Sequence, residues 1–176
     1  AGTVRLAAAA QPVLYDVNLR FDAAHGRPRQ HYDAATHTLI VRSDSVRADP
    51  LSFSLRNHSV WHADAGDDSG GTTLGLGLAP GVPLDLDLSL GACETTLDLS
   101  HLSVQRLQLR TGASESTITF GTPNPIPMSS LDIVIGAADL TVHSLGNAHA
   151  AAVSVKTGVG GADLDYVFPN LGNFTT

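Results

Sequence analysis

The stretch LDLSLGACETTLDL, from Leu86 to Leu99, decides the fold of this chain, because its pattern returns three more times before the C-terminus. The later copies are LQLRTGASESTITF from Leu107, LDIVIGAADLTVHS from Leu131 and VSVKTGVGGADLDY from Val153. Successive copies start 21, 24 and 22 residues apart. Within each copy apolar and polar residues alternate, which is typical of strands that bury one face.

Five columns of residues keep the same offsets in all four copies. Two are aliphatic columns in the first strand, one is glycine, one is the small residue after it, and one is aliphatic in the second strand. The columns are Leu86, Leu107, Leu131 and Val153; Leu88, Leu109, Ile133 and Val155; Gly91, Gly112, Gly136 and Gly158; Ala92, Ala113, Ala137 and Val159; and Leu97, Ile118, Val142 and Leu164.

Each copy therefore consists of a strand, a glycine corner and a second strand. A single copy cannot bury its apolar face alone, so it must stack on the next copy. We predict an all-β, single-domain, β-solenoid-like stack. Its structural corners are the four glycines, where a Cβ would clash or where φ must be positive. A β-sandwich is the alternative, since turn signals every 8–12 residues or so suit that fold as well.

Composition limits the class of protein. The chain has 176 residues, which suits one domain, and its 10 basic against 17 acidic residues give a net charge of −7. This balance argues against nucleic-acid binding, and the single cysteine excludes a disulfide framework. No uncharged stretch reaches the ~20 residues that a membrane-spanning helix needs. The start at Ala1 favours an exported, processed protein.

The first part of the chain lacks the glycine column. Its patterns predict strands over Val13–Phe21, Thr38–Val41 and Leu51–Leu55, with a long loop or hairpin over Asp22–Thr36. We expect residues 1–60 to cap or extend the stack, and residues 61–176 to form the repeat region with a C-terminal cap, in one continuous domain. Trp61 is expected to cap the core, because an open solenoid end exposes unpaired backbone groups.

Weak metal candidates are found in two kinds of segment. Asp64, Asp67 and Asp68 could offer oxygen ligands to calcium, but the EF-hand spacing is absent. The eight histidines lack a fixed ligand spacing, including His58 and His62 and the group in the Asp22–Thr36 region. We therefore expect no metal and no cofactor, and a solvated acidic loop over 64–71.

Stacking of the repeats predicts an acidic column of Glu94, Glu115 and Asp139 along one side. Carboxylates at the ~5 Å strand spacing repel one another unless they are solvated or bridged. An exposed corner face is the expected arrangement, and a cation ladder is the alternative. The sequence has no nucleophile elbow, and Cys93 is expected to be an inert packed thiol.

The C-terminal tail from Val167 to Phe174 is apolar and rich in turn residues. It either folds over the last coil as a cap or contacts a partner through Phe168, Leu171 and Phe174.

The segments PLDLDLSLGACETTLDLSHLSVQRLQLRTGASESTITF and LGNAHAAAVSVKTGVGGADLDY resemble the toast-rack and LiaF-like group of bacterial β-stack domains. The resemblance covers about Trp61 to Tyr166 and is strongest from Leu145 to Asp165. It implies a domain outside the cytoplasmic membrane, in the periplasm or at the cell surface. It implies no catalytic residues, since the group has none assigned.

These observations favour a non-enzymatic extracytoplasmic interaction or structural domain, either an accessory subunit of a membrane-associated complex or an adhesin-like surface protein. Its expected partners are other envelope or membrane proteins, and no nucleic acid. Two alternatives stay open. One is a carbohydrate-binding or carbohydrate-hydrolysing envelope protein that uses the acidic column. The other is an envelope-stress sensor domain, which follows from the resemblance alone.

Overall fold

The computed structural model describes residues 2–10, 15–21, 28–33, 35, 38–43, 51–56, 60–65, 73–112, 115–165 and 173–175. These residues form strands joined by turns, with a single 3-10 turn, η2, at Leu145–Ala148. The strands are β1 (Gly2–Ala8), β2 (Tyr15–Phe21), β3 (Pro28–Asp33), β4 (Thr38–Ser43), β5 (Leu51–Arg56), β6 (Val60–Ala65), β7 (Thr73–Leu78), β8 (Pro83–Leu90), β9 (Cys93–Asp98), β10 (Ser103–Thr111), β11 (Ser116–Thr119), β12 (Ser130–Ala137), β13 (Leu140–His143), β14 (Ala152–Val159), β15 (Ala162–Leu164) and β16 (Asn173–Thr175).

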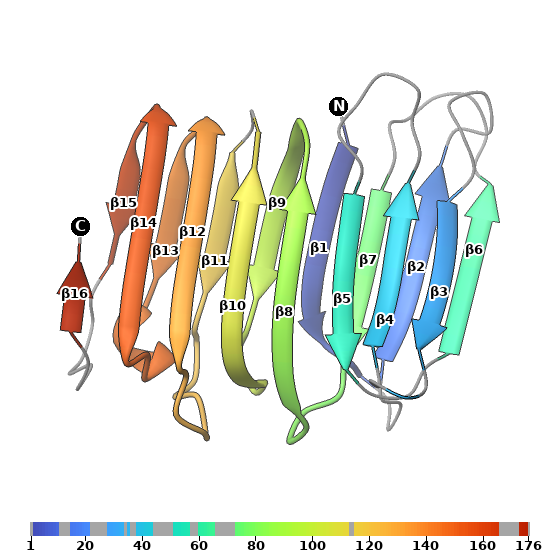
Figure 1. Cartoon of the computed structure of the whole chain (residues 1–176), viewed down its shortest axis with the longest axis horizontal. Helices are drawn as coiled ribbons and strands as arrows, with labels where there is room; N and C mark the ends of the chain where they lie inside the picture. The colour runs from blue at the N-terminus through green and yellow to red at the C-terminus, as the bar shows by residue number, and fades with distance from the viewer. Residues whose placement is uncertain are drawn as a thin grey trace.

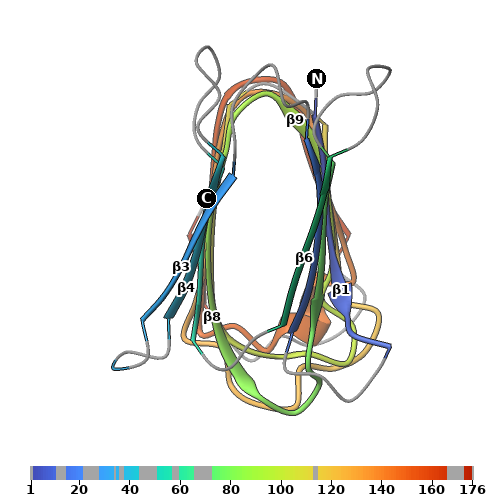
Figure 2. The same ribbon diagram turned by 90° about the vertical axis from the view of Figure 1, so that its right-hand side faces the viewer.

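The strands lie in two facing sheets of eight strands each (Figures 1 and 2). Sheet 1 has the order β15-β13-β11-β9-β1-β7-β2-β6, and sheet 2 has the order β16-β14-β12-β10-β8-β5-β4-β3. From β8 onward successive strands belong alternately to sheet 2 and sheet 1. Within each sheet, each of these strands pairs in parallel with the strand two places earlier in the chain, from β10 with β8 to β15 with β13. This is a β-solenoid, as the sequence predicted.

The aliphatic columns predicted from the sequence coincide with rows of register partners in the two sheets. In sheet 2, Leu107 is the register partner of both Leu86 and Leu131, and Leu131 is the partner of Val153. In sheet 1, Ile118 lies between Leu97 and Val142 in the same way. The side chains of these columns fill the space between the sheets, and buried Leu, Ile and Val residues from every coil form one core. Burial of aliphatic side chains is therefore the main stabilising term, at about 25 cal/mol per Å² of apolar surface.

The four corner glycines are neighbours from coil to coil, at the carboxyl ends of β8, β10, β12 and β14, here called the upper turns. A Cβ on Gly136 would lie 2.5 Å from the carbonyl oxygen of Gly112, and a Cβ on Gly158 would lie 2.6 Å from that of Gly136. A Cβ on Gly112 would lie 3.5 Å from the carbonyl of Gly91, which is an ordinary contact. Close approach of successive backbones, rather than a positive φ, therefore requires glycine at Gly136 and Gly158.

At the lower turns, which precede β8, β10, β12 and β14, a buried polar side chain connects successive coils. There, Asn124 is buried and its side chain replaces missing backbone pairing between coils. Its Oδ1 accepts a hydrogen bond from Val104 N at 3.1 Å, and its Nδ2 donates to Val104 O at 2.7 Å and to Ala148 O at 3.2 Å. The loop that carries it, residues 121–127, extends below β11 and β12 (Figure 1). Left-handed φ values at the lower turns belong to Gly81, His101, Ser144 and His149.

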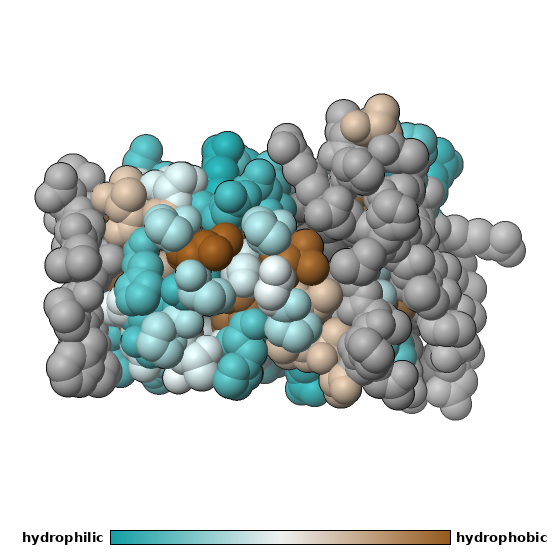
Figure 3. Space-filling model, turned by 90° about the horizontal axis from the view of Figure 1, so that it is seen from below, coloured by the Kyte–Doolittle hydropathy of each residue, from teal (hydrophilic) through white to brown (hydrophobic). Residues whose placement is uncertain are grey.

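The underside formed by these turns is mostly hydrophilic, and its apolar residues form small separate spots rather than one patch (Figure 3). Among the residues with described side chains, the large exposed apolar ones are Val134 and Val159.

The N-terminal part joins the same two sheets. Strand β1, which the sequence patterns did not reveal, lies between β7 and β9 in the middle of sheet 1 and pairs in parallel with both. The Asp22–Thr36 region contains β3, which forms an antiparallel hairpin with β4. The expected division at residue 60 stays a prediction, and strand pairing crosses it, because β1 precedes that boundary and both of its partners, β7 and β9, follow it.

Candidate functional site

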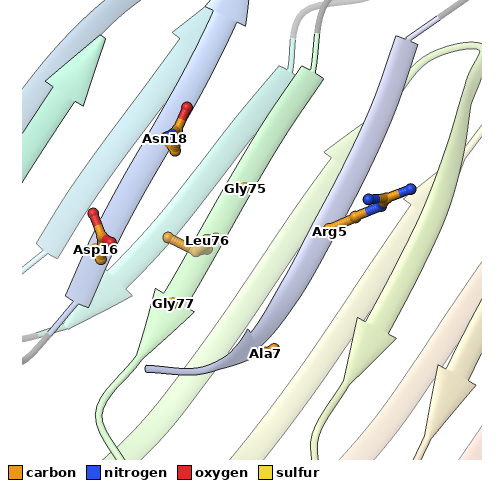
Figure 4. A pocket seen from close by; sticks show the side chains of 7 residues that line it. All are labelled: Arg5, Ala7, Asp16, Asn18, Gly75, Leu76 and Gly77. Atoms are coloured by element: carbon orange, nitrogen blue, oxygen red, sulfur yellow. The ribbon is translucent and has the colours of Figure 1, made fainter. Parts of the chain in front are cut away.

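A shallow trough of about 280 Å³ runs along β7 on the outer face of sheet 1 (Figure 4). Its floor is the backbone of β7, where Gly75 and Gly77 are the outward-facing positions. Register places Gly75 between Arg5 of β1 and Asn18 of β2. It places Gly77 between Ala7 and Asp16 in the next row, and the side chains of these four neighbours form the walls.

The glycines of the trough are not required by the fold. A Cβ on Gly75 would meet its nearest neighbour, the carbonyl oxygen of Asn18, at 3.6 Å, and one on Gly77 would meet Ala9 at 3.4 Å. Both are van der Waals distances, and neither glycine has a positive φ. Glycine inside a strand weakens it, so these two positions keep the trough open at some cost in stability.

The trough offers hydrogen-bonding groups without catalytic chemistry. Arg5 supplies donors, Asp16 supplies acceptors and Asn18 supplies both, and all three side chains are exposed. A nucleophile with an adjacent base is missing from its lining. The arrangement suits contact with a polar, extended segment of another molecule.

The backbone aligns the three residues of the acidic column in successive coils. Thr95 N donates to Glu115 O at 3.0 Å, and Ser116 N donates to Asp139 O at 2.9 Å, so Glu94, Glu115 and Asp139 occupy equivalent places in successive coils. All three side chains are exposed.

One carboxylate of the column has a structural role. An oxygen of Asp139 accepts a hydrogen bond from Gly161 N at 2.9 Å and so holds the next upper turn. The column is thus an exposed corner face, as expected.

Within the described part of the chain, no three His, Cys, Asp or Glu side chains are grouped so that they could hold a metal ion. Of the metal candidates, Asp67, Asp68 and His58 lie outside the described residues, and so do His25 and His37. Asp64 and His62 belong to β6, and Trp61 does too, but only their backbone is described.

Cys93 is packed inside the stack, with a relative exposure of 5%. Burial raises the pKa of its thiol, while a hydrogen-bond contact with Thr95, at 3.7 Å between Sγ and Oγ1, opposes that shift. A thiol of raised pKa is a poor nucleophile, which fits the expectation of an inert packed residue.

The predicted partner-contact residues of the tail are only partly covered by the structure. Phe168 and Leu171 lie outside the described residues. Phe174 belongs to β16, whose backbone pairs in parallel with the start of β14, with Phe174 opposite Val153. The role of these three residues stays a prediction. Sequence reasoning missed the trough, although the alternation Leu74-Gly-Leu-Gly-Leu78 was a signal for it.

The family model for the N-terminal domain of toast_rack, DUF2154, matches residues 1–126, which is more than two thirds of the chain. The chain belongs to the toast-rack family. The match includes the N-terminal strands, which the resemblance at Trp61–Tyr166 did not cover. No curated protein and no solved structure gives a significant match to this toast-rack domain.

Toast-rack domains are generally extracytoplasmic. Among the described residues of this one, no helix is long and apolar enough to span a bilayer.

Proposed function

We propose that this toast-rack domain is a non-enzymatic interaction or structural module of the bacterial cell envelope, located outside the cytoplasmic membrane. The observation that carries the proposal is the division between interior and surface. The space between the sheets is filled by aliphatic columns, whereas the outer faces are regular arrays of polar side chains. A filled interior suits a rigid scaffold whose faces contact other proteins.

We propose the outer face of sheet 1, at the trough over β7, as the surface that contacts the partner. Two strand glycines that the fold does not need leave room for close approach of another backbone. Arg5, Asp16 and Asn18 supply the polar groups that would fix such a segment. The finer form of the proposal is an accessory subunit of a membrane-associated complex, held to its partner through this trough.

Location is tested by labelling intact cells. Thr96 is exposed on the outer face of β9, so Thr96→Cys creates a reactive surface thiol. The wild-type chain is the matched control, because its own Cys93 is buried. We expect a membrane-impermeant maleimide to label Thr96→Cys in intact cells. Labelling only after lysis would contradict an extracytoplasmic location.

Contact at the trough is tested with a photo-crosslinking amino acid. Asn18 in the trough and Gln108 on the outer face of sheet 2 are replaced in turn by p-benzoylphenylalanine. We expect a discrete adduct with an envelope protein from position 18, and its loss when Gly75→Val fills the trough. A Cβ has room at Gly75 and β-branched side chains suit strands, so we expect Gly75→Val to fold normally, which circular dichroism checks. An equal adduct from position 108 would refute the assignment to the trough.

The carbohydrate alternative is tested on the acidic column. The chain is incubated with envelope polysaccharide, and release of products is measured for the wild type and for the double variant Glu94→Gln, Glu115→Gln. We expect no turnover by either protein. Turnover by the wild type that the double variant loses would overturn the non-enzymatic proposal.

A further inference from the structure

The outer faces of the two sheets differ in charge. Among the described side chains, the outer face of sheet 1 carries one cation, Arg5, and six carboxylates. These carboxylates are Asp16, Glu94, Asp98, Glu115, Asp139 and Asp163. On the outer face of sheet 2 the described side chains include four cations and four carboxylates, namely Arg29, Arg106, Arg110 and Lys156, and Asp33, Asp85, Asp87 and Asp132. The excess of carboxylates therefore lies on the face that carries the trough.

The carboxylates on sheet 1 have neutral neighbours in the adjacent strands. The register partner of Asp16 in β7 is Gly77, and the register partner of Glu94 in β1 is Thr3. Both carboxylates belong to exposed residues. Their charge is thus available to a group that approaches the face from outside.

On sheet 2, by contrast, opposite charges are adjacent. Asp85 of β8 is the register partner of Arg106 of β10. In the same pair of strands, Nη1 of Arg110 lies 3.7 Å from Oδ1 of Asp87. Charge on this face is compensated within the face, so sheet 1 is the face that attracts an oppositely charged partner.

The trough itself is flanked by two carboxylates. In the row of Gly77, the register partners are Ala7 of β1 on one side and Asp16 of β2 on the other. The parallel register of β1 and β9 continues this row to Asp98. The backbones of Asp16 and Asp98 are thus three strand spacings apart, or ~14 Å at ~4.8 Å per strand. The floor between them consists of the small residues Ala7 and Gly77, which leaves room for a cationic side chain of a partner.

The cation of this face does not fill the trough. Arg5 belongs to the next row, beside Gly75. In Figure 4 its side chain extends from β1 away from Gly75. The glycine floor therefore stays open, and a carboxylate, rather than the guanidinium, borders the row of Gly77.

The spacing of the carboxylates suits an extended chain better than a single ion. Within the described residues no three His, Cys, Asp or Glu side chains are grouped so that they could hold a metal ion. The carboxylates instead lie one by one along the face, as Glu94 and Glu115 do in successive coils. Charges distributed over a flat face are complementary to a chain that carries several cations.

We propose that the partner segment held in the trough is an extended segment of an envelope protein that is rich in lysine and arginine. Its backbone passes over Gly75 and Gly77, and one of its cations lies between Asp16 and Asp98. This inference rests on the proposed function, since it names the chemistry of the segment that the trough contacts.

Two matched synthetic peptides test the charge of the partner. One alternates threonine with lysine and the other alternates threonine with glutamate, and binding to the 176-residue chain is measured by fluorescence anisotropy. We expect the lysine peptide to bind and the glutamate peptide not to bind. Binding of the lysine peptide should weaken in high salt, because the screening length falls from ~10 Å at ~0.1 M to ~3 Å at ~1 M ionic strength. Equal or tighter binding of the glutamate peptide would overturn the proposal.

Two double variants with the same net charge locate the binding face. Asp16→Asn with Asp98→Asn removes the carboxylates that flank the trough, and Asp87→Asn with Asp132→Asn removes two from the outer face of sheet 2. Asparagine at position 98 keeps an acceptor for Ser100 N, which lies 3.0 Å from the native carboxylate. We expect the first pair to weaken binding of the lysine peptide roughly fivefold or more, and the second pair to change it about twofold or less. Equal weakening would contradict the proposal, because only the total charge would then matter.

Asn18→Asp provides a test in the opposite direction. Asn18 is exposed in the wall of the trough, and aspartate has nearly the same shape, so this variant adds a charge without removing a packed group. We expect it to bind the lysine peptide roughly threefold more tightly. Unchanged or weaker binding would contradict the proposal, even where the paired neutral variants do not fold.

Competition with the photo-crosslink separates this inference from the proposed function. Each peptide is added in excess before irradiation of the chain that carries p-benzoylphenylalanine at position 18. We expect the lysine peptide to abolish the adduct with the envelope protein, and the glutamate peptide to leave it intact. Mass spectrometry should place the adduct in a segment rich in lysine or arginine. An adduct that survives the lysine peptide, or that lies in an acidic segment, would overturn the basic partner while leaving the trough contact in place. Absence of any adduct without added peptide would instead overturn the trough contact itself.

Discussion

The same substitution at two stacked glycines should change stability in opposite directions. In Gly136→Ala the new Cβ would lie 2.5 Å from the carbonyl oxygen of Gly112, far closer than a carbon and an oxygen can approach. That oxygen cannot move freely, because it accepts a hydrogen bond from Ala137 N at 2.8 Å. The coils must separate locally, and overpacking of this kind costs about 1–3 kcal/mol.

Gly112→Ala is the matched control. Its Cβ would lie 3.5 Å from the nearest atoms of Gly91, and φ at Gly112 is not positive. Alanine there needs no displacement and reduces the entropy of the unfolded chain, which stabilises proteins by about 0.4–1 kcal/mol. Both variants share this unfolded-state effect, so it cancels, and their difference of ~1–3 kcal/mol measures the contact between coils.

Urea unfolding monitored by circular dichroism checks the comparison. With a slope of about 2 kcal/mol per M, the midpoints of the two variants should differ by ~0.5–1.5 M, while the slope stays the same. Gly112→Ala as destabilised as Gly136→Ala would refute the reasoning, because the two positions would then not differ in their distance to the coil below.

Three further outcomes are expected. Deleting residues 1–8 removes β1 from between β7 and β9, and we expect the cooperative unfolding transition to disappear, which calorimetry would show; a synthetic peptide of that sequence should restore it. Asn124→Ala leaves three buried backbone partners without hydrogen bonds, and we expect a loss of ~2–4 kcal/mol in urea unfolding, whereas an alanine at exposed Gln105 should change little. Burial raises the pKa of the Cys93 thiol, so its contribution to stability is fully present below the ordinary thiol pKa and is lost as pH rises from there toward the raised value. Unfolding free energies of the wild type should therefore fall more than those of Cys93→Ala when the pH is raised from neutral to alkaline, and parallel curves would contradict this.

The sequence by itself determined the coils and their register. Alternation of period two assigned each residue to one face of a strand, and the recurrent glycine marked the corner, so the ladders of Leu86, Leu107, Leu131 and Val153 could be aligned directly. This worked because each coil stacks on its neighbour in sequence, and the same short pattern encodes both partners.

Tertiary structure alone decided the place of β1 and the existence of the trough. The partners of β1 are strands about 70 and 90 residues later in the chain, and no local pattern in Gly2–Ala8 encodes them. The trough depends on the same insertion, since Gly75 and Gly77 become a floor only when β1 and β2 lie on either side of β7.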